Sequence, residues 1–309
     1  MAQNERFNIL INKDSGTVRR LGMEGVETII SASPINLKSL IFVSSDEIES
    51  RFEQLMAQDY PILLGGGDGT IAHAVSYFQP AQKPFGILPM GTMNLMAGDL
   101  GIPAKLEEAL AQYAKGTRVI TVDMGEVNGR PFLCCAALGV MPEASKFREN
   151  NRGSPDAILM PRLTLFILEQ LKRTHHRKIR TVLDGVKKRF RTAALIISNN
   201  QYAQENKNTG AAAVAKEKLN SGLLGIYNIL PRNLWERLLL LFRLRIGGWK
   251  SDPFVREYTA KEFIIHSDRH KELVSIDGEP VEMEVPLKFS LRPSTLQLLL
   301  PHLLPDPTK

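Results

Sequence analysis

Gly65-Gly66-Gly67-Asp68-Gly69-Thr70 is the stretch that decides the fold. It follows the apolar run at residues 61–64 and precedes a helical pattern at residues 71–78. Consecutive glycines let backbone N–H groups approach an anion without a Cβ in the way, and the positive end of the following helix points to the same place. Strand, glycine turn and helix therefore predict a phosphate-binding loop.

Asp68 is the unusual member of this loop. A carboxylate beside phosphate groups is repelled unless a divalent cation or a transferable proton accompanies it. We expect Asp68 either to help bind Mg²⁺ or to accept the proton of an attacking hydroxyl. The alternative is structural, with a tight glycine turn in which Asp68 is the N-cap of the next helix.

The chain around this loop repeats one pattern, in which a short apolar run is followed by turn residues and a helical period. The apolar runs cover residues 7–11, 40–43, 61–64 and 85–88. This order predicts an α/β/α domain with a parallel sheet over residues 1–122. Ser44 and Glu47 form a capping-box pattern ahead of an apolar stripe, which predicts a helix start.

Two more loops stand at equivalent places after predicted strands. One is Pro89-Met90-Gly91-Thr92-Met93-Asn94, and the other is Asn12-Lys13-Asp14-Ser15-Gly16-Thr17. Loops at the carboxyl ends of neighbouring parallel strands converge on one crevice, where α/β sheets bind nucleotides. The sequence therefore predicts that these loops and the glycine loop form a single site.

Residues 123–309 differ in character, because apolar stretches alternate with polar turns. Asn128-Gly129 joins two such stretches, residues 124–127 and 132–136, as a two-residue hairpin turn. Helical patterns interrupt the strands at residues 159–172 and 234–246. Later strand-like stretches cover residues 263–266, 273–276, 285–291 and 296–300. We predict a second, antiparallel, β-sandwich-like domain, whose last residues pack back on the first domain.

The composition is that of an ordinary globular protein. The chain has 309 residues, of which 43% are hydrophobic and 23% charged, which excludes a fibrous or disordered protein. Its net charge of +6 favours an anionic partner. No apolar stretch approaches the roughly 20 residues that span a bilayer, so we expect a cytoplasmic protein with reversible contact at the inner face of the plasma membrane.

The loops resemble the signatures of a known family. Residues 65–70 and 89–94 are similar to the paired G-G-D-G-T and P-x-G-T-x-N motifs of diacylglycerol kinases, sphingosine kinases and related bacterial lipid kinases. The first motif is shared with NAD kinases, and the second narrows the choice to lipid kinases. Residues 12–16 resemble the family's N-P-x-S-G loop, with Lys13 in place of proline, and residues 277–279 resemble its D-G-E motif.

The resemblance implies an NAD-kinase-like first domain that binds ATP and a β-rich second domain that binds lipid. It implies transfer of the γ-phosphoryl group to a hydroxyl of a diacylglycerol-like or other long-chain lipid. Carried over by position, the nucleotide contacts are Asn12, Ser15, Gly16, Ser44, Gly66, Gly67, Asp68, Gly69, Thr70, Gly91, Thr92 and Asn94. Asp68, Asp277 and Glu279 are the implied catalytic acids, and Asp68 and Asp277 the implied Mg²⁺ ligands.

Departures from the family keep two alternatives open. Asn220 and Gly225 stand where many bacterial members have carboxylates for a second, structural Mg²⁺, so we expect that site to be missing. A nucleotide- or lipid-binding regulator that has lost turnover is one alternative. Ala72 and His73 stand where the lipid kinases commonly have Asn and Glu. An NAD kinase is the other alternative, but no Asn-Glu pair follows the glycine loop where that family would hold its dinucleotide.

Two segments bear on the partner. Residues 172–191 are rich in lysine and arginine, which suits the phosphates of RNA, acidic lipid headgroups or simply solvent, but no motif for reading bases accompanies them. Residues 234–246 combine Trp235, leucines and Phe242 with several arginines, a composition suited to a membrane interface. Core packing or a homodimer contact is the alternative for that helix. We expect an anionic membrane as partner and no nucleic acid.

Overall fold

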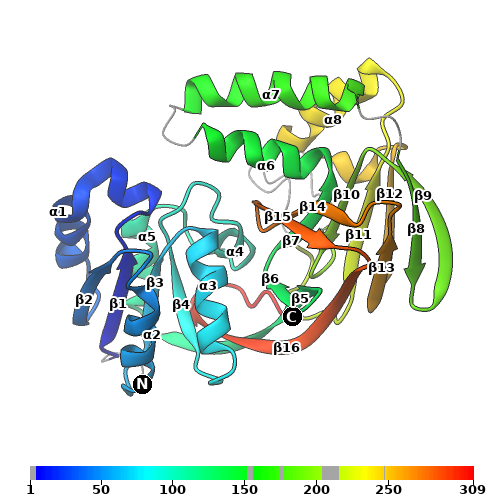
Figure 1. Ribbon diagram of the computed structural model, residues 1–309. Coiled ribbons are helices and arrows are strands. Elements are labelled where there is room, and N and C mark those ends of the chain that lie inside the picture. Colours follow the sequence, from blue (N-terminus) through cyan, green and yellow to red (C-terminus); the bar gives the residue numbers. More distant parts are fainter. Residues whose placement is uncertain (1–4, 152–155, 174–176, 204–215, 247) are drawn as a thin grey trace. The chain divides into compact units, whose positions relative to one another are not determined.

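The computed structural model of the chain describes residues 5–151, 156–173, 177–203, 216–246 and 248–309. It divides into two compact units, coloured along the chain in Figure 1. Unit 1 comprises Met1–Asp123 and Pro293–Lys309, and unit 2 comprises Met124–Arg292. Strands β5 (Thr117–Val127) and β16 (Leu287–Pro301) each run from one unit into the other.

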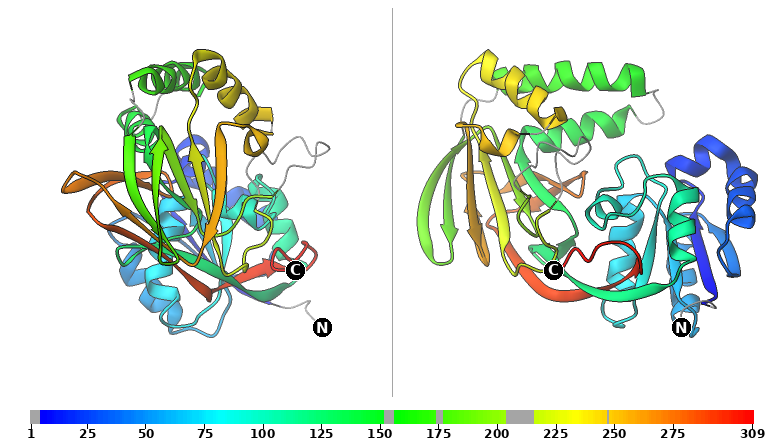
Figure 2. Two further views of the ribbon diagram at one scale, coloured as in Figure 1. Left: turned by 90° about the vertical axis from the view of Figure 1, so that its right-hand side faces the viewer. Right: turned by 180° about the vertical axis from the view of Figure 1, so that it is seen from behind.

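Unit 1 is an α/β/α domain, as predicted. Its elements are β1 (Phe7–Asn12), α1 (Gly16–Ala32), β2 (Leu37–Val43), α2 (Ile48–Met56), β3 (Ile62–Gly66), α3 (Asp68–Phe78), β4 (Phe85–Pro89), α4 (Leu95–Asp99) and α5 (Leu106–Tyr113). Its strands lie in the order β2-β1-β3-β4-β16, and neighbouring strands are parallel. Helices α2 and α3 cover one face of this sheet, and α1 and α5 cover the other (Figures 1 and 2).

The register of the sheet brings the predicted loops to one edge. Asn12 pairs with Val43, and Gly66 pairs with Pro89, so β1, β2, β3 and β4 end side by side. The strands are held there by burial, since every residue of β1, β3 and β4 is buried. Burial of this apolar surface contributes about 25 cal/mol per Å².

Unit 2 is a two-sheet antiparallel domain with three long helices. Its elements are β6 (Arg130–Phe132), β7 (Cys135–Gly139), α6 (Val140–Asn150), α7 (Asp156–Arg173), β8 (Arg177–Leu183), β9 (Val186–Thr192), β10 (Ala194–Ser198), β11 (Leu224–Ile229), α8 (Leu234–Ile246), η1 (Trp249–Ser251), β12 (Val255–Ala260), β13 (Glu262–His266), β14 (Lys271–Ile276) and β15 (Glu279–Glu284).

The two sheets of unit 2 pack on a shared core. One has the order β12-β11-β10-β7-β14-β15, and the other continues from β16 through β13 and β8 to β9. Phe263 and Phe289 of the second sheet lie in one buried cluster with Leu195 and Ile226 of the first. The antiparallel sandwich predicted from the sequence is therefore confirmed. Helices α6, α7 and α8 lie together at one end of it (Figure 2).

The predicted hairpin at Asn128-Gly129 is correct only in its first half. Val127 pairs with Arg130 across the turn, and both turn residues have positive φ angles, 48° at Asn128 and 83° at Gly129. The second strand ends at Phe132, however, and β7 begins at Cys135 in the other sheet. The strand breaks because the intervening backbone N–H groups donate to a side chain, described below.

Two further strands differ from expectation. The segments predicted at residues 285–291 and 296–300 belong to the single long strand β16. Among the described residues, no helix is long and apolar enough to cross a membrane.

Candidate active site

The glycine loop forms the turn from β3 into α3. Gly67 is the N-cap of α3, in extended conformation, and Asp68 is its first helical residue. A Cβ on Gly66 would lie 2.5 Å from the Cβ of Thr70, so no side chain fits there. The first backbone N–H groups of a helix have no partner within it, and here they follow directly on the glycines. The loop has the form of an anion cradle.

The loop after β4 lies against the glycine loop. A Cβ on Gly91 would come within 2.5 Å of the Cα of Gly67, so the two backbones touch. The N–H of Met90 donates to the carbonyl of Gly66 at 3.2 Å. Asn94, in the left-handed conformation with φ of 49°, accepts from the N–H of Gly91 at 2.7 Å and donates to its carbonyl at 2.9 Å. Asn94 therefore shapes this loop, whatever ligand it also contacts.

The loop after β1 completes the cradle. The amide of Asn12 donates to the Oγ1 of Thr70 at 3.0 Å and accepts from the N–H of Asp14 at 2.9 Å. The N–H of Thr17 donates to the carbonyl of Met90 at 3.0 Å, which joins this loop to the one after β4. The structure thus brings together most of the predicted nucleotide contacts of unit 1.

Ser15 carries the clearest sign of a missing ligand in this cradle. Its side chain is buried, and its hydroxyl has no hydrogen-bond partner among the described residues. A buried hydroxyl without a partner costs about 1–3 kcal/mol, so a native protein rarely keeps one without a reason. A phosphate oxygen or a water at this position would supply the missing acceptor.

Ser44 and Thr92 differ in their surroundings from the other predicted nucleotide contacts. The hydroxyl of Ser44 donates to the carboxylate of Glu47 at 3.0 Å, which supports the local, structural interpretation of that residue. Helix α2 begins at Ile48 with Glu47 as its N-cap, so the predicted capping box stands just before the helix. Thr92 is exposed, and its Oγ1 would lie 3.7 Å from a Cβ on Gly16.

Asp68 is partly buried in the cradle. Burial raises its pKa, while hydrogen bonds from the N–H groups of Met96, Leu95 and Asn94 act in the opposite direction. The N–H of Met96 lies 3.4 Å from Oδ1. Desolvation thus makes ionised Asp68 unfavourable in the free protein, a situation that a bound cation would relieve.

The other two predicted acids follow β14 in unit 2, and their environments differ. Asp277, with φ of 47°, accepts the backbone N–H groups of Leu133 at 2.7 Å, Cys134 at 2.8 Å and Cys135 at 3.0 Å. Burial raises its pKa, and these three hydrogen bonds act against the increase. Glu279 is exposed, with its carboxylate 3.9 Å from the Arg130 guanidinium.

The sequence predicted that Asp277 and Glu279 are both catalytic acids, and their different environments in the structure give them different roles. The oxygens of Asp277 are already engaged in holding the segment between β6 and β7, so Asp277 positions backbone. The carboxylate of Glu279 remains accessible to a reactant. Sequence reasoning missed the three amide donors because backbone groups carry no signature in the sequence.

A metal ion in the cradle would be bound through Asp68. The described part of the chain contains no group of three or more His, Cys, Asp or Glu side chains suited to hold an ion. Mg²⁺ usually keeps several waters and is bound through one or two carboxylates plus the phosphates of the substrate. Asp68 fits such a site as a single protein ligand.

A glycine cradle on a parallel α/β/α unit, combined with an antiparallel sandwich unit, defines a kinase-type architecture, and comparison with known proteins places the chain within it. Residues 6–127 match the family described as "Diacylglycerol kinase catalytic domain". Residues 143–300 match the "YegS C-terminal NAD kinase beta sandwich-like domain". The chain belongs to the diacylglycerol kinase catalytic-domain family, in the group with a YegS-type C-terminal domain.

Relatives and solved structures agree with this assignment. The chain is 33% identical over 259 residues to a protein of Pseudomonas savastanoi pv. phaseolicola named "Probable lipid kinase YegS-like", covering 81% of this chain and 78% of that protein. A protein of the same name from Pseudomonas aeruginosa is 30% identical over 254 residues, covering 81% and 80%. A diacylglycerol kinase structure from Bacillus anthracis has a TM-score of 0.66 at 16% identity, covering 95% and 96%, which shows a shared fold.

Proposed function

We propose that this chain is an ATP-dependent lipid kinase. It transfers the γ-phosphoryl group to a hydroxyl of a diacylglycerol-like or other long-chain lipid in an anionic membrane. The observation that carries the proposal is the cradle of unit 1, in which three loops meet around touching glycines and the unpartnered hydroxyl of Ser15. The names of its relatives support lipid rather than NAD as the acceptor.

The residues of the cradle have distinct tasks in this proposal. Backbone N–H groups of residues 66–70 bind phosphate oxygens, and the Ser15 hydroxyl donates to one of them. Asp68 holds Mg²⁺ when the ion is bound, and the ion neutralises charge on the phosphates. Phosphoryl transfer asks the protein mainly for this positioning and neutralisation.

A carboxylate must also receive the proton of the attacking hydroxyl. The hydroxyl oxygen forms a bond to the γ-phosphorus as the bond from that phosphorus to the leaving ADP oxygen breaks. We assign the proton to Glu279 rather than Asp277, because the carboxylate of Asp277 is occupied by three amides. Asp277 then acts through the backbone that it positions.

Incubation with labelled ATP, Mg²⁺ and a total lipid extract tests the proposal, with NAD offered in a parallel reaction. Labelled lipid is the expected product. Labelled NADP would replace the proposal with an NAD kinase. Binding of ATP without any labelled product would indicate a regulator that has lost turnover, and the kinase proposal would fail.

A further inference from the structure

We propose that one face of unit 2 binds an anionic phospholipid bilayer, with a cationic groove contacting headgroups and helix α8 entering the interface. The proposal deepens the proposed function, and rests on it for the identity of the membrane as the source of substrate. The binding itself is measured without ATP, so the two can fail separately.

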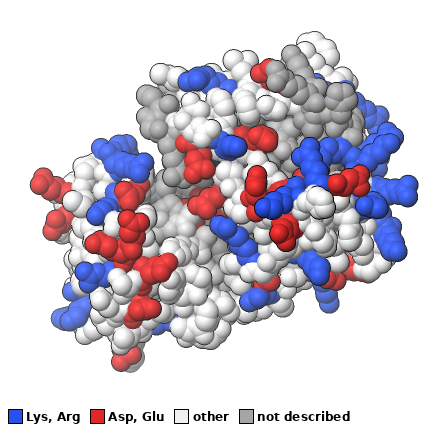
Figure 3. Space-filling model, in the orientation of Figure 1, with Lys and Arg blue, Asp and Glu red and all other residues white. Residues whose placement is uncertain are grey.

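The groove has a volume of about 1430 Å³ and lies in unit 2. Seven lysine and arginine residues line it and are exposed: Lys178, Arg180, Lys188, Arg189, Arg191, Arg232 and Arg256. Figure 3 shows lysine and arginine gathered over the part of unit 2 where Figure 1 places β8 and β9. We call this feature the basic groove.

The strand register concentrates like charges in the basic groove. Lys178 pairs with Arg191 across β8 and β9, and Arg180 pairs with Arg189. All four project from the face opposite the buried pair of Ile179 and Phe190. Like charges directly opposite each other destabilise a sheet, so this ladder is unfavourable unless an anion neutralises it. A surface rich in phosphate would do so.

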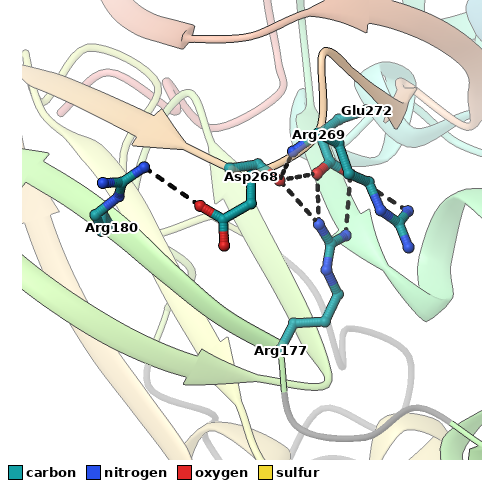
Figure 4. A network of polar contacts seen from close by, with 6 residues as sticks. Arg177, Arg180, Asp268, Arg269 and Glu272 are labelled. Carbon is teal, nitrogen blue, oxygen red and sulfur yellow. Dashed lines mark hydrogen bonds and ion pairs between the residues drawn. The ribbon is translucent and has the colours of Figure 1, made fainter.

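Carboxylates of the protein do little to neutralise this ladder. Asp268 is paired with Arg180 at 3.3 Å, and both side chains are exposed. Elsewhere in the described chain, no acid forms an ion pair with Lys178, Arg189 or Arg191. Arg177 shows the contrast, since its guanidinium turns away to the buried carboxylate of Glu272 (Figure 4). Arg177 therefore has a structural role, whereas Lys178, Arg189 and Arg191 are available to bind a ligand.

Helix α8 offers an apolar face beside the groove. Trp235 is 79% exposed and Phe242 is 59% exposed, and Leu238 and Leu239 are exposed between them. This spacing places the four side chains on one side of the helix. Leu240 faces the opposite way and is buried with Trp249 and its neighbours. Side chains of residues 244–246, including Arg245 and Ile246, lie outside the described residues, and so do those at 172–176 of the basic run.

The groove and the apolar face adjoin. Arg232 and Glu236 line the groove. Arg232 lies just before α8 and Glu236 in its first turn, next to Trp235. The N–H of Glu236 donates to the Oδ1 of Asn233 at 2.8 Å, and the Glu236 carboxylate accepts from the N–H of Arg232, so both side chains hold the start of α8. Cations next to exposed Trp, Phe and Leu are the pattern of an interfacial helix.

This combination selects a membrane over the other candidate partners. A nucleic acid would satisfy the cations but leave the apolar face of α8 in water. If a second copy of this chain bound at this surface through a two-fold axis, the two basic grooves would lie close together. Their like charges would repel each other. An anionic bilayer supplies phosphates and hydrocarbon at the same surface.

Intrinsic fluorescence gives a direct test, because the chain has only two tryptophans. Trp249 is 2% exposed, so a change in emission on vesicle binding reports on Trp235. We expect the emission to shift to the blue with phosphatidylcholine vesicles containing 30% phosphatidylglycerol, and the shift to disappear at high salt. No shift and no co-sedimentation at low salt, or equal binding to pure phosphatidylcholine, would overturn the proposal.

Two matched pairs of variants locate the contact. Arg180→Gln with Arg189→Gln should weaken vesicle binding roughly tenfold to thirtyfold, since each cation near an anionic surface contributes on the scale of a severalfold change. Arg20→Gln with Lys115→Gln, exposed in unit 1, should leave it unchanged. Phe242→Ser should reduce the emission shift, whereas Leu303→Ser, which is 61% exposed, should not. Equal effects from test and control variants would contradict the assignment.

Two further outcomes decide between occupants. If Phe242→Ser converts a dimer to a monomer in sedimentation velocity and vesicles do not bind, α8 is a contact between copies and the proposal is wrong. Preferential binding of RNA over vesicles would also overturn it. Vesicle binding without lipid phosphorylation would leave the docking surface standing and reject the kinase. Phosphorylation of detergent-dispersed lipid without vesicle binding would support the kinase and reject the docking surface.

Discussion

Gly67 and Gly91 approach so closely that a Cβ on Gly91 would lie 2.5 Å from the Cα of Gly67. The contact joins the turn after β3 to the turn after β4, and neither backbone can retreat without moving the end of its strand. These two turns are two of the three loops that form the proposed phosphate site. The requirement for glycine at position 91 is therefore geometric, and it can be tested by adding a single methyl group.

Gly91→Ala should damage both stability and nucleotide binding. The added Cβ meets backbone rather than a flexible side chain, so we expect a loss of about 1–3 kcal/mol in the free energy of unfolding. ATP affinity, measured by calorimetry, should fall. Gly98→Ala is the matched control, because a Cβ there has no neighbour within 4 Å. If Gly91→Ala bound ATP as tightly as Gly98→Ala, the two turns would not form the phosphate site.

Asp68→Asn should separate activity from stability. We expect lipid phosphorylation to fall by roughly 10² to 10⁴. Burial raises the pKa of Asp68 and so favours its neutral form, which means its contribution to stability is largest in acid and is lost as pH rises through that pKa. The variant should therefore be at least as stable as the wild type at neutral pH, as measured by urea denaturation.

The same shift predicts the pH dependence of the wild type. Activity that needs ionised Asp68 should decline as pH falls through its raised pKa. The residual activity of Asp68→Asn should not show this decline as pH falls. Full activity of Asp68→Asn at neutral pH would remove Asp68 from the mechanism.

Removal of the charge should mainly lower stability at Asp277 and mainly lower activity at Glu279. Asp277→Ala leaves three buried N–H groups without an acceptor, so we expect a loss of about 2–4 kcal/mol in the free energy of unfolding. Glu279→Gln should leave stability within about 0.5 kcal/mol and lower kcat. Thermal unfolding and lipid labelling measure the two effects. A fully active Glu279→Gln would move the proton acceptor elsewhere.

The Arg177–Glu272 pair anchors the base of the hairpin that carries the basic groove. Burial alone would raise the pKa of Glu272, but hydrogen bonds from Arg177 and Ser267 outweigh it and lower the pKa. This stabilisation is present above the ordinary glutamate pKa of about 4.3 and is lost as pH falls through the lowered value. Glu272→Gln should cost about 3 kcal/mol at neutral pH and less in acid. Loss of equal size at both pH values would exclude the charge as the cause.

The fold of both units could be predicted because their signals are local. Apolar runs followed by turn residues gave the strands of unit 1, and Gly66 and Asp68 marked the turn from strand to helix. In contrast, α6 was not predicted, and the helix after the first strand was predicted only as part of the repeated pattern, without bounds. Helix α1 contains Gly22 at a positive φ of 75°, and its kink weakens the helical period. The single strand β16 was predicted as two, because the polar residues between Leu291 and Leu296 interrupt its apolar pattern.

The candidate site could be predicted only where side chains carry the chemistry. Asn12, Asp68 and Thr70 stand in recognisable motifs, and the structure brings them together. The carboxylate of Asp277 accepts hydrogen bonds from the N–H groups of Leu133 and Cys134. These residues are distant from Asp277 in the sequence, and backbone donors cannot be recognised from the sequence. The ladder of Lys178 and Arg191 likewise depends on strand register. Pairing across the chain decides these features, and composition shows only that the charges exist.

A structure of the protein with Mg²⁺ and a non-hydrolysable ATP analogue tests the central claim most directly. We predict phosphate oxygens within hydrogen-bond distance of the backbone N–H groups of residues 66–70, one of them accepting from the Ser15 hydroxyl, with Mg²⁺ next to Asp68. Phosphates bound elsewhere, or a glycine loop without any ligand at saturating nucleotide, would contradict the account.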